Sequence, residues 1–521
     1  MSNKKVVKDF SNVFLFTAIC SILGFFRETI IAKQFGVGYQ TDIFYFSLSI
    51  ISIIMLGIGA GLANVFIPMF IESLQNKSKE EANDFANNVL NIIIIISLIS
   101  VVFLYIFMKK IISLLAPGFA KDTEIYMFSV LICRISITSL IFNAIKSVFL
   151  SIAQANKEFR TVSYSNLLLN GILVAWSLVT GNKFGILGLT IINVLAFFIQ
   201  MISYIPMLKK VGFKYKFTLN IKDENIIYMV KLLGPVLISS SANQINMLAD
   251  KTVASMLGAG SIAILNFSGK ISNVIYVIIG TSISTVVYSS LASFKANNNL
   301  ESYEETLSGS IRISIFIMLP IVFGTIILRN QIVSLLFEGG NFNERDVSYT
   351  ATVLAAYAPT ILFFSMKDLL NKAFYSIHDT RVPMLTDILS VVINVTLNIL
   401  LSRIFGISGL AAATSLASVV TTVVLFLCIK RKIHKFNYKK VLVASLKSLV
   451  SCFVMLLTIM ILNYIVKQNI SMDKVTTLIY TFIIIIIGAA SYLFTSNIIR
   501  SEEYKIIMNY LNKSLKLKLK R

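Results

Sequence analysis

Charged side chains are scarce in this sequence. Asp, Glu, Lys and Arg together make up only 14% of the 521 residues, whereas apolar residues make up 56% and the mean hydropathy is +0.80. A water-soluble domain of this length could not hide so much apolar surface in its core. The composition therefore excludes a soluble protein and indicates an integral membrane protein.

Residues that often carry catalysis or bind metals are also few. The four cysteines fall in apolar runs without a Cys-x-x-Cys spacing, which predicts neither a disulfide framework nor a cysteine metal site. The two histidines, His378 and His434, lie among charged residues in predicted loops. The sequence also lacks a Gly-rich phosphate loop, a His-Glu-x-x-His motif and a nucleophile–base set in its apolar runs. We therefore expect no ATPase, hydrolase or redox enzyme.

The apolar runs have the length of transmembrane helices. Residues 91–108 and 475–494 are long enough, at 1.5 Å per residue, to cross a hydrocarbon core of roughly 30 Å. Such runs must be helical, because lipid offers no partner to unpaired backbone groups. Polar and Gly-rich breaks divide the chain into about fourteen predicted spans. These are residues 10–36, 42–72, 84–108, 125–154, 161–180, 184–208, 227–257, 262–292, 306–328, 346–375, 382–403, 407–429, 441–466 and 475–498.

The chain contains an internal repeat. Residues 184–189 (Phe-Gly-Ile-Leu-Gly-Leu) return as residues 405–410 (Phe-Gly-Ile-Ser-Gly-Leu), and the Gly-Val-Gly of residues 36–38 meets the Gly-Ala-Gly of residues 258–260. Two six-helix repeats that face a central cavity are a transporter architecture. We therefore predict an all-α integral membrane fold with an N-lobe (1–220), a C-lobe (221–435), two C-terminal helices (436–498) and a basic cytoplasmic tail (499–521).

Lysine and arginine are unevenly distributed between alternate loops. The loops on the side of the N-terminus carry most of them, which predicts that both termini are cytoplasmic. The net charge of +22 is spread over loops between spans rather than gathered on one domain. It therefore does not indicate a nucleic-acid partner.

A few charged residues fall inside predicted spans. An ionisable side chain at the centre of a lone helix costs about 2.5 to 3.5 kcal/mol, so it usually faces a wet cavity or a partner. We predict that basic and acidic residues of both lobes line one cavity for an anionic ligand. Structural ion pairs, of Arg27 with Glu28 or Asp42 and of Lys270 with Asp250, are the alternative. The predicted ligand-binding residues are Arg27, Glu28, Asp42, Lys251 and Lys270.

A second polar set lies in the C-lobe. Asn394 and Asn398 are one turn apart, and Thr414 follows in the next span. With Asp250 they could offer oxygen ligands to a sodium ion. Hydrogen bonding between helices explains the two asparagines and the threonine equally well. We expect no cofactor, and coupling to sodium or to the membrane potential.

Several motifs resemble the MurJ/MviN family of lipid II flippases, which belongs to a larger group with multidrug exporters and polysaccharide flippases. They are residues 23–28 (Leu-Gly-Phe-Phe-Arg-Glu), 35–38 (Phe-Gly-Val-Gly), 41–42 (Thr-Asp), 66–68 (Phe-Ile-Pro), 374–376 (Phe-Tyr-Ser) and 379–383 (Asp-Thr-Arg-Val-Pro). The resemblance implies fourteen helices in two lobes plus a terminal pair. It also implies that the positions of Arg27, Glu28, Asp42 and Lys270 contribute to the central cavity.

The same resemblance implies the cargo. Family members are held to move undecaprenyl-pyrophosphate-linked disaccharide-pentapeptide to the outer leaflet, which implies a multi-pass protein of the bacterial cytoplasmic membrane. Separately, we expect the protein to work as a monomer. The chain departs from the family at Ile22 and Ile54, where members often carry basic residues. A flippase for another polyprenyl-linked oligosaccharide therefore stays open, and so does a cation-coupled multidrug exporter. Arg27 and Lys270 argue against the exporter, because a drug cavity would favour acids and aromatics.

Overall fold

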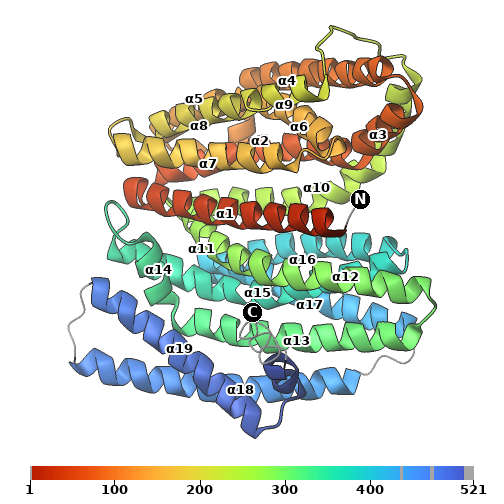
Figure 1. The fold of residues 1–521 in the computed structure, drawn as a ribbon. Helices are drawn as coiled ribbons and strands as arrows, with labels where there is room; N and C mark the ends of the chain where they lie inside the picture. The colour runs from red at the N-terminus through yellow and green to blue at the C-terminus, as the bar shows by residue number, and fades with distance from the viewer. Residues whose placement is uncertain (1–2, 434–437, 470–473, 510–521) are drawn as a thin grey trace. The chain divides into compact units, whose positions relative to one another are not determined.

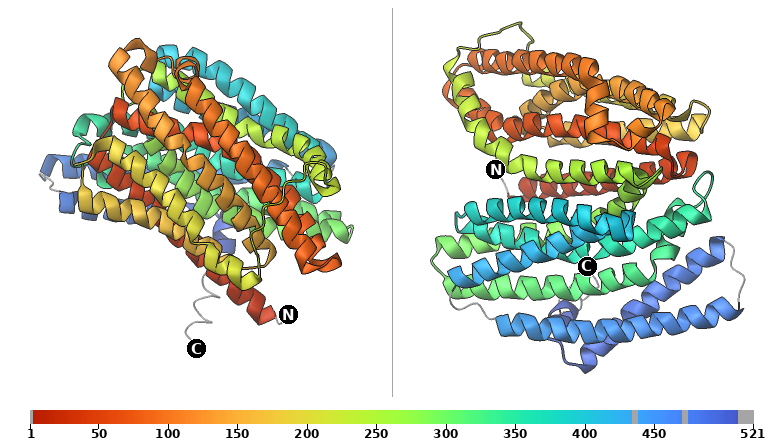
Figure 2. Two further views of the ribbon diagram at one scale, coloured as in Figure 1. Left: turned by 90° about the horizontal axis from the view of Figure 1, so that it is seen from above. Right: turned by 180° about the vertical axis from the view of Figure 1, so that it is seen from behind.

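The computed structural model describes residues 3–433, 438–469 and 474–509 of the chain (Figure 1). Helices are the regular secondary structure of these three ranges. Most of the long helices lie side by side within their own unit (Figure 2). His434 and residues 510–521 of the predicted tail lie outside the described residues.

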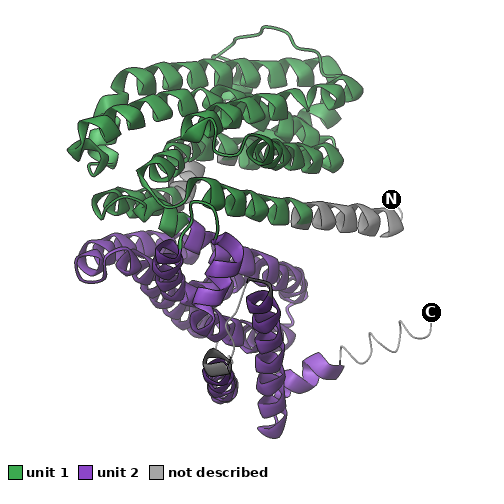
Figure 3. Ribbon diagram, turned by 90° about the vertical axis from the view of Figure 1, so that its left-hand side faces the viewer, with its two compact units in different colours: residues 1–266, 339–343 green, residues 267–338, 344–521 purple. Residues whose placement is uncertain are grey.

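The chain forms two compact units, residues 1–266 with 339–343 and residues 267–338 with 344–521 (Figure 3). The first contains α1 (Asn3–Phe35), α2 (Tyr39–Gly61), η1 (Leu62–Phe66), α3 (Ile67–Asn76), α4 (Lys79–Leu115), η2 (Phe119–Lys121), α5 (Thr123–Ile137), α6 (Ser139–Ala155), α7 (Phe159–Thr180), α8 (Gly185–Ile202), α9 (Ile205–Val211), α10 (Glu224–Met256) and the first residues of α11 (Ser261–Ile275). The second contains the rest of α11, η3 (Tyr276–Gly280), α12 (Thr281–Ala296), α13 (Leu300–Ile327), α14 (Arg329–Phe337), α15 (Glu344–Ser376), α16 (Arg381–Phe405), α17 (Ile407–Lys432), α18 (Tyr438–Asn469) and α19 (Lys474–Ile498). The compact units divide within α11, whereas the predicted boundary at residue 220 separates the two sequence repeats. The two divisions describe different things, so the lobe boundary stays a prediction.

Twelve helical segments among the described residues are long and apolar enough to cross a membrane. They coincide with twelve of the predicted spans, and α5 with α6 fills one of them, as α2, η1 and α3 fill another. The two remaining predicted spans correspond to α1 and α10, which are helices of 33 residues each. At 1.5 Å per residue each is about 50 Å long, more than a hydrocarbon core requires.

The structure contains the repeat that the sequence predicts. Gly185 and Gly406, which occupy matching positions, have φ angles of 57° and 56°. Each lies at the start of an apolar helix, where a residue with positive φ favours glycine. The second long helix of each repeat is also interrupted by a five-residue π-helical segment, η1 in one and η3 in the other. A π segment inside a helix is rare and often lies at a functional site.

Polar side chains fix where several spans begin. Asp122 accepts hydrogen bonds from the backbone of Glu124 and Ile125 at the start of α5. Asp223 caps α10 and Asn299 caps α13 in the same manner. Such caps satisfy N–H groups that have no partner within the helix.

Each unit has its own packed interior. In the first, Phe66 stacks on Phe70 and Phe85 with ring centroids 5.3 and 5.5 Å apart. In the second, α18 and α19 pack on α13, where the Tyr492 hydroxyl donates to the Phe316 carbonyl at 2.8 Å. The two predicted C-terminal helices therefore belong to the core of the second unit.

Candidate functional site

The helix that carries Arg27 is held by regularly spaced contacts with α7. Cys20 Sγ contacts the Ser163 carbonyl at 3.6 Å, Arg27 Nη1 donates to Asn170 Oδ1 at 3.0 Å, and Gln34 Nε2 donates to the Ser177 carbonyl. The three positions are seven residues apart on both helices, so α1 and α7 run in the same direction and contact each other along one face of each helix. These contacts fix the rotation of α1 about its axis and thereby the direction of the Arg27 side chain.

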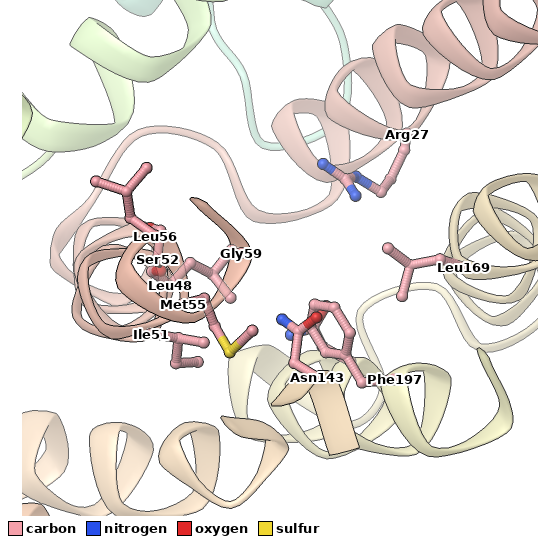
Figure 4. A pocket seen from close by; sticks show the side chains of 11 residues that line it. Arg27, Leu48, Ile51, Ser52, Met55, Leu56, Gly59, Asn143, Leu169 and Phe197 are labelled. Atoms are coloured by element: carbon pink, nitrogen blue, oxygen red, sulfur yellow. Dashed lines mark hydrogen bonds between the residues drawn. The ribbon is translucent and has the colours of Figure 1, made fainter. Parts of the chain in front are cut away.

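Arg27 lies against a cavity inside the first unit. The cavity has a volume of about 500 Å³ and is bordered by α1, α2, α6, α7 and α8. Figure 4 shows the Arg27 side chain directed into this space, opposite Asn143 and Phe197. The other lining residues are Leu48, Ile51, Ser52, Met55, Leu56, Gly59, Leu169 and Asn193. The walls are therefore mostly apolar, with a guanidinium, two amides and one hydroxyl among them.

Glu28 gathers donors from three helices. Arg27 Nη2 donates to its Oε1 at 2.5 Å, and the Tyr45 hydroxyl donates to its Oε2 at 2.5 Å. Asn266 Nδ2 of α11 also contacts Oε2, at 3.4 Å. The side chain is only 4% exposed. A carboxylate buried to this degree is stable only with such partners, and the ion pair is the one that the structural alternative predicts for Arg27.

Asp42 binds the beginning of α11. Its two carboxylate oxygens accept from the backbone N–H groups of Gly260 at 2.6 Å and Ala263 at 2.7 Å, and the residue is 1% exposed. The first N–H groups of a helix lack partners within it and carry a partial positive charge. Asp42 therefore acts as an anionic cap that comes from a different helix.

Lys251 connects α10 to α2. Its Nζ donates to the Tyr45 carbonyl at 2.9 Å and to the Ser49 hydroxyl. These bonds leave Lys251 directed at α2 rather than at the lining of the Arg27 cavity. Its predicted ligand-binding role stays a prediction.

The other predicted charges are divided between the units. Asp250 precedes Lys251 on α10 in the first unit, whereas Lys270 lies on the part of α11 that belongs to the second. Lys270 follows Asn266 by four residues, so the two share a face of α11. A chamber shared by Arg27 and Lys270 stays a prediction.

The polar set of the C-lobe forms a hydrogen-bonded chain between α16 and α17. Asn398 Nδ2 donates to Asn394 Oδ1 at 2.8 Å, and Asn394 Nδ2 donates to Thr414 Oγ1 at 3.0 Å. This is the geometry of polar contacts between helices. Asp250 lies in the other unit, so the predicted sodium site of these four residues stays a prediction. Among the described residues, no three His, Cys, Asp or Glu side chains gather as metal ligands do.

Glycines bring backbone segments into direct contact near Asp42. A Cβ on Gly36 would overlap the Asn341 carbonyl, and one on Gly340 would overlap the Lys33 carbonyl. A Cβ on Gly118 would likewise overlap the Ser255 carbonyl. The Asn341 N–H donates to the Lys33 carbonyl at 2.8 Å. We call the contacts of residues 33–42 and 118 with residues 255–263 and 339–343 the glycine seam; all of them lie in the first unit.

Two groups of polar side chains, one at the cavity and one on α4, were not predicted from the sequence. Asn143 and Asn193 line the Arg27 cavity. The sequence feature that could have identified them is a lone amide side chain within an apolar span. The second group clamps the backbone that leads from α9 to α10. Asn88 both donates to the Asn220 carbonyl and accepts from its N–H, at 2.9 Å each. The four asparagines of this clamp share one face of α4 and are Asn83, Asn87, Asn88 and Asn91.

Comparison with known proteins gives consistent matches. Residues 31–482 match the family model described as "Lipid II flippase MurJ". The chain is 27% identical to the probable lipid II flippase MurJ of Rickettsia prowazekii, over 94% of this chain and 96% of that protein. It is 28% identical to the lipid II flippase MurJ of Thermosipho africanus, over 85% of this chain and 89% of that protein.

Solved structures agree. A lipid II flippase MurJ in an inward closed conformation superposes with a TM-score of 0.78 at 26% identity, over 95% of this chain and 99% of that one. An inward-facing MATE family multidrug transporter of the MOP superfamily superposes with a TM-score of 0.66 at 16% identity, over 80% of this chain and 95% of that one. The second likeness concerns the fold alone. The predicted all-α integral membrane fold is confirmed.

Proposed function

The chain belongs to the lipid II flippase MurJ family, and from this membership we propose that it moves lipid II, a polyprenyl-pyrophosphate-linked disaccharide-peptide, from the cytoplasmic to the outer leaflet. The family is one of transporters and not of enzymes. The protein is accordingly a multi-pass protein of the inner membrane, and its substrate class is a lipid-linked glycan.

The first unit contains the kind of polar cavity that such a cargo requires. A pyrophosphate with sugars and peptide cannot cross hydrocarbon unaided, because each desolvated charge costs several kcal/mol even after relaxation. It needs a polar route through the bilayer. The observation that carries the proposal is the cavity with Arg27 and two amides inside an apolar helical unit, in a chain whose residues 31–482 match the family.

Transport by alternating access requires a contact that closes one end and can open again. The glycine seam has the properties of such a contact. It joins segments far apart in the chain through direct backbone approach, and Asp42 ties the start of α11 into it. We infer that the seam is closed in the described conformation and opens in the opposite one.

Orientation, coupling and assembly are parts of the same proposal. We propose that both termini face the cytoplasm, on the asymmetry of lysine and arginine between loops. We also propose a sodium ion at Asp250, Asn394, Asn398 and Thr414, or the membrane potential, as the driving force, and a monomer as the working unit. Replacing sodium by potassium at clamped potential tests the first driving force, and light scattering of the purified protein tests the monomer.

A flippase for another polyprenyl-linked oligosaccharide is the second candidate. It is favoured by Ile22 and Ile54, which are apolar where the family often carries basic residues; Ile22 is 65% exposed. Fewer cations suit a head group with less negative charge. The drug exporter has no observation in its favour beyond the shared fold.

Complementation tests the function. The host flippase is depleted, this chain is expressed, and lipid II exposed at the outer leaflet is assayed. We expect wild type to restore exposure, Arg27→Ala and Lys270→Ala to abolish it at normal membrane abundance, and the control Arg160→Ala, at an exposed arginine of α7, to behave as wild type. Growth without lipid II exposure would instead support another glycan, and normal exposure with both alanine variants would contradict the assigned roles of these residues.

A further inference from the structure

The connection between α9 and α10 is held along α4 by the asparagine clamp. Three of the asparagines donate from Nδ2 to backbone carbonyls that follow one another along the connection. The pairs are Asn83 with Gly212 at 3.1 Å, Asn87 with Lys214 at 2.9 Å, and Asn91 with Lys216 at 3.3 Å and Thr218 at 2.9 Å. Four residues of α4 rise about 6 Å, and two residues of the connection cover each such step. This advance of about 3 Å per residue is that of an extended chain, so residues 212–218 lie extended beside the first part of α4.

The pairing with α4 sets the depth of the connection in the membrane. Asn91 directly precedes residues 92–108 of α4, a run without charged residues that ends at Lys109 and Lys110. At 1.5 Å per residue this run is about 26 Å long, close to the thickness of a hydrocarbon core. Asn91 therefore lies at the boundary between hydrocarbon and head groups. Phe217 lies at the same level, because Asn91 binds the carbonyls on both sides of it.

The connection presents apolar side chains outward at this level. Tyr215, Phe217 and Leu219 are alternate residues, and alternate side chains of an extended chain lie on one side. All three are exposed, Phe217 to 71%. The Tyr215 hydroxyl donates to Asn91 Oδ1 at 3.0 Å, which leaves its ring beside the clamp. Aromatic side chains with one polar end are typical of the membrane–water interface.

The charge of the connection is positive. Residues 209–222 contain five lysines and no acidic residue. Lys210 pairs with Glu158 at 2.6 Å and Lys216 with Asp84 at 3.4 Å. In the part of the chain that the structure describes, the lysines without a carboxylate in ion-pair contact are Lys209, Lys214 and Lys222. Lysines beside apolar side chains at a membrane surface favour anionic lipid.

The clamp also explains how an extended backbone can lie at this depth. Hydrocarbon offers no partner to a free backbone group, and an unpaired group there is unfavourable. The amides of α4 satisfy the carbonyls of alternate residues from Gly212 to Asn220. The backbone groups between them need water. The connection is therefore suited to the head-group region and not to the hydrocarbon beyond it.

We propose that residues 214–221 form a membrane anchor, in which Tyr215, Phe217 and Leu219 insert below the head groups and the neighbouring lysines bind the phosphates of anionic phospholipids. The inference needs only the membrane-spanning fold and goes beyond transport. Lipid is favoured over a protein partner, because the apolar side chains lie level with the end of the apolar run of α4 and carry lysines beside them.

Fluorescence quenching by brominated lipids tests the depth of the anchor. The single tryptophan is removed by Trp176→Phe, and Phe217→Trp introduces a new one at the anchor. The protein is placed in vesicles of phosphatidylcholine and phosphatidylglycerol whose acyl chains carry bromine at different depths. We expect quenching that is strongest for bromine nearest the glycerol. The control Lys77→Trp, at an exposed position about 20 Å from Asn91 along the axis of α4, should not be quenched.

A second series tests the anionic lipid. Bromine is placed either on phosphatidylglycerol alone or on phosphatidylcholine alone, and the ratio of quenching of Phe217→Trp gives the local lipid preference. We expect a preference for phosphatidylglycerol that falls about fivefold in Lys214→Gln and again in Lys222→Gln. The matched control Lys121→Gln removes an exposed lysine beyond the other end of α4 and should leave the preference unchanged.

The role of the clamp has its own variant. Asn91→Leu removes the donor to two carbonyls and the acceptor of the Tyr215 hydroxyl, so the Phe217→Trp side chain should move outward and be quenched less. Equal quenching in that background would overturn the argument on depth. Water-like emission of Phe217→Trp without quenching by any lipid would overturn the anchor and indicate that a soluble protein covers these side chains. Quenching without a preference for phosphatidylglycerol would overturn the binding of anionic lipid.

Discussion

The contact of Asp42 with α11 predicts how one substitution shifts the conformational equilibrium. The carboxylate accepts two backbone hydrogen bonds, at 2.6 and 2.7 Å, from the first turn of that helix. In Asp42→Ala both acceptors are lost, and the N–H groups of Gly260 and Ala263 stay buried without them. If these bonds exist only while the glycine seam is closed, the substitution destabilises the closed state and leaves the open one nearly unchanged.

The size of the effect follows from the two bonds. A hydrogen bond to a charged group contributes about 1.5 to 3 kcal/mol, and burial of the carboxylate offsets part of the sum. A net loss of about 3 kcal/mol corresponds to a shift of roughly 100-fold in the ratio of closed to open protein. Asp42→Asn keeps one oxygen acceptor and should shift the ratio by roughly tenfold.

Cysteine labelling measures this ratio. Ser261 is 1% exposed at the seam, so Ser261→Cys in a background without the four native cysteines should react with a membrane-impermeant maleimide only when the seam opens. The labelling rate then follows the population of the open state. We expect Asp42→Ala to raise that rate roughly 100-fold, while the reference Gln40→Cys, at an exposed position, labels equally in both backgrounds.

An unchanged labelling rate of Ser261→Cys in the Asp42→Ala background would refute the reasoning. If that variant also bound lipid II more weakly, Asp42 would act as a direct ligand of the substrate, as the sequence predicts, and not as a latch on α11.

Three other substitutions give separate tests. Gly118→Ala should raise Ser261→Cys labelling in the same direction, because its Cβ overlaps a backbone carbonyl, whereas the matched control Gly38→Ala meets no atom within 4 Å and should have no effect. Arg312→Ala leaves Glu503, which is 2% exposed, without its cation and should lower the unfolding free energy by about 3 to 5 kcal/mol, seen as a lower Tm in detergent; an unchanged Tm would contradict this. Lys432 lowers the pKa of Asp379, so this carboxylate stabilises the fold above the ordinary aspartate pKa of about 3.9. That stabilisation is lost as the pH falls through the lower pKa of the folded state, so Asp379→Asn should lower Tm at neutral pH, and the difference from wild type should vanish in acid.

The membrane spans were predictable because their signal is local. A run of about twenty apolar residues suffices to identify a span, and the lipid forces it to be helical. The repeat was predictable because glycines with positive φ, such as Gly185 and Gly406, tolerate few replacements and so keep their identity in both copies. The short helix α14 and the π segments have no comparable signal, since packing decides both.

The partners of the charged residues were not predictable, because they lie far away in the sequence. Arg27 was recognised from its place in an apolar span, but its acceptor Asn170 lies 143 residues later. Asp42 is predicted as a ligand-binding residue, which stays a prediction, and its carboxylate accepts from backbone N–H groups more than 200 residues away. Backbone donors have no sequence signature, so only the fold reveals that this carboxylate caps a distant helix.

The two acidic residues connect the cavity to the seam. Glu28 holds Arg27 on one side and Asn266 of α11 on the other, while Asp42 holds the first turn of the same helix. A ligand that changes how Arg27 bonds to Glu28 therefore changes how strongly α11 is held. By thermodynamic reciprocity, a ligand that shifts the closed–open equilibrium by a given factor would have its own affinity changed by the same factor on opening. Under the proposed alternating access, coupling between binding and opening would therefore need no long path, because Glu28 contacts both Arg27 and the helix that Asp42 caps.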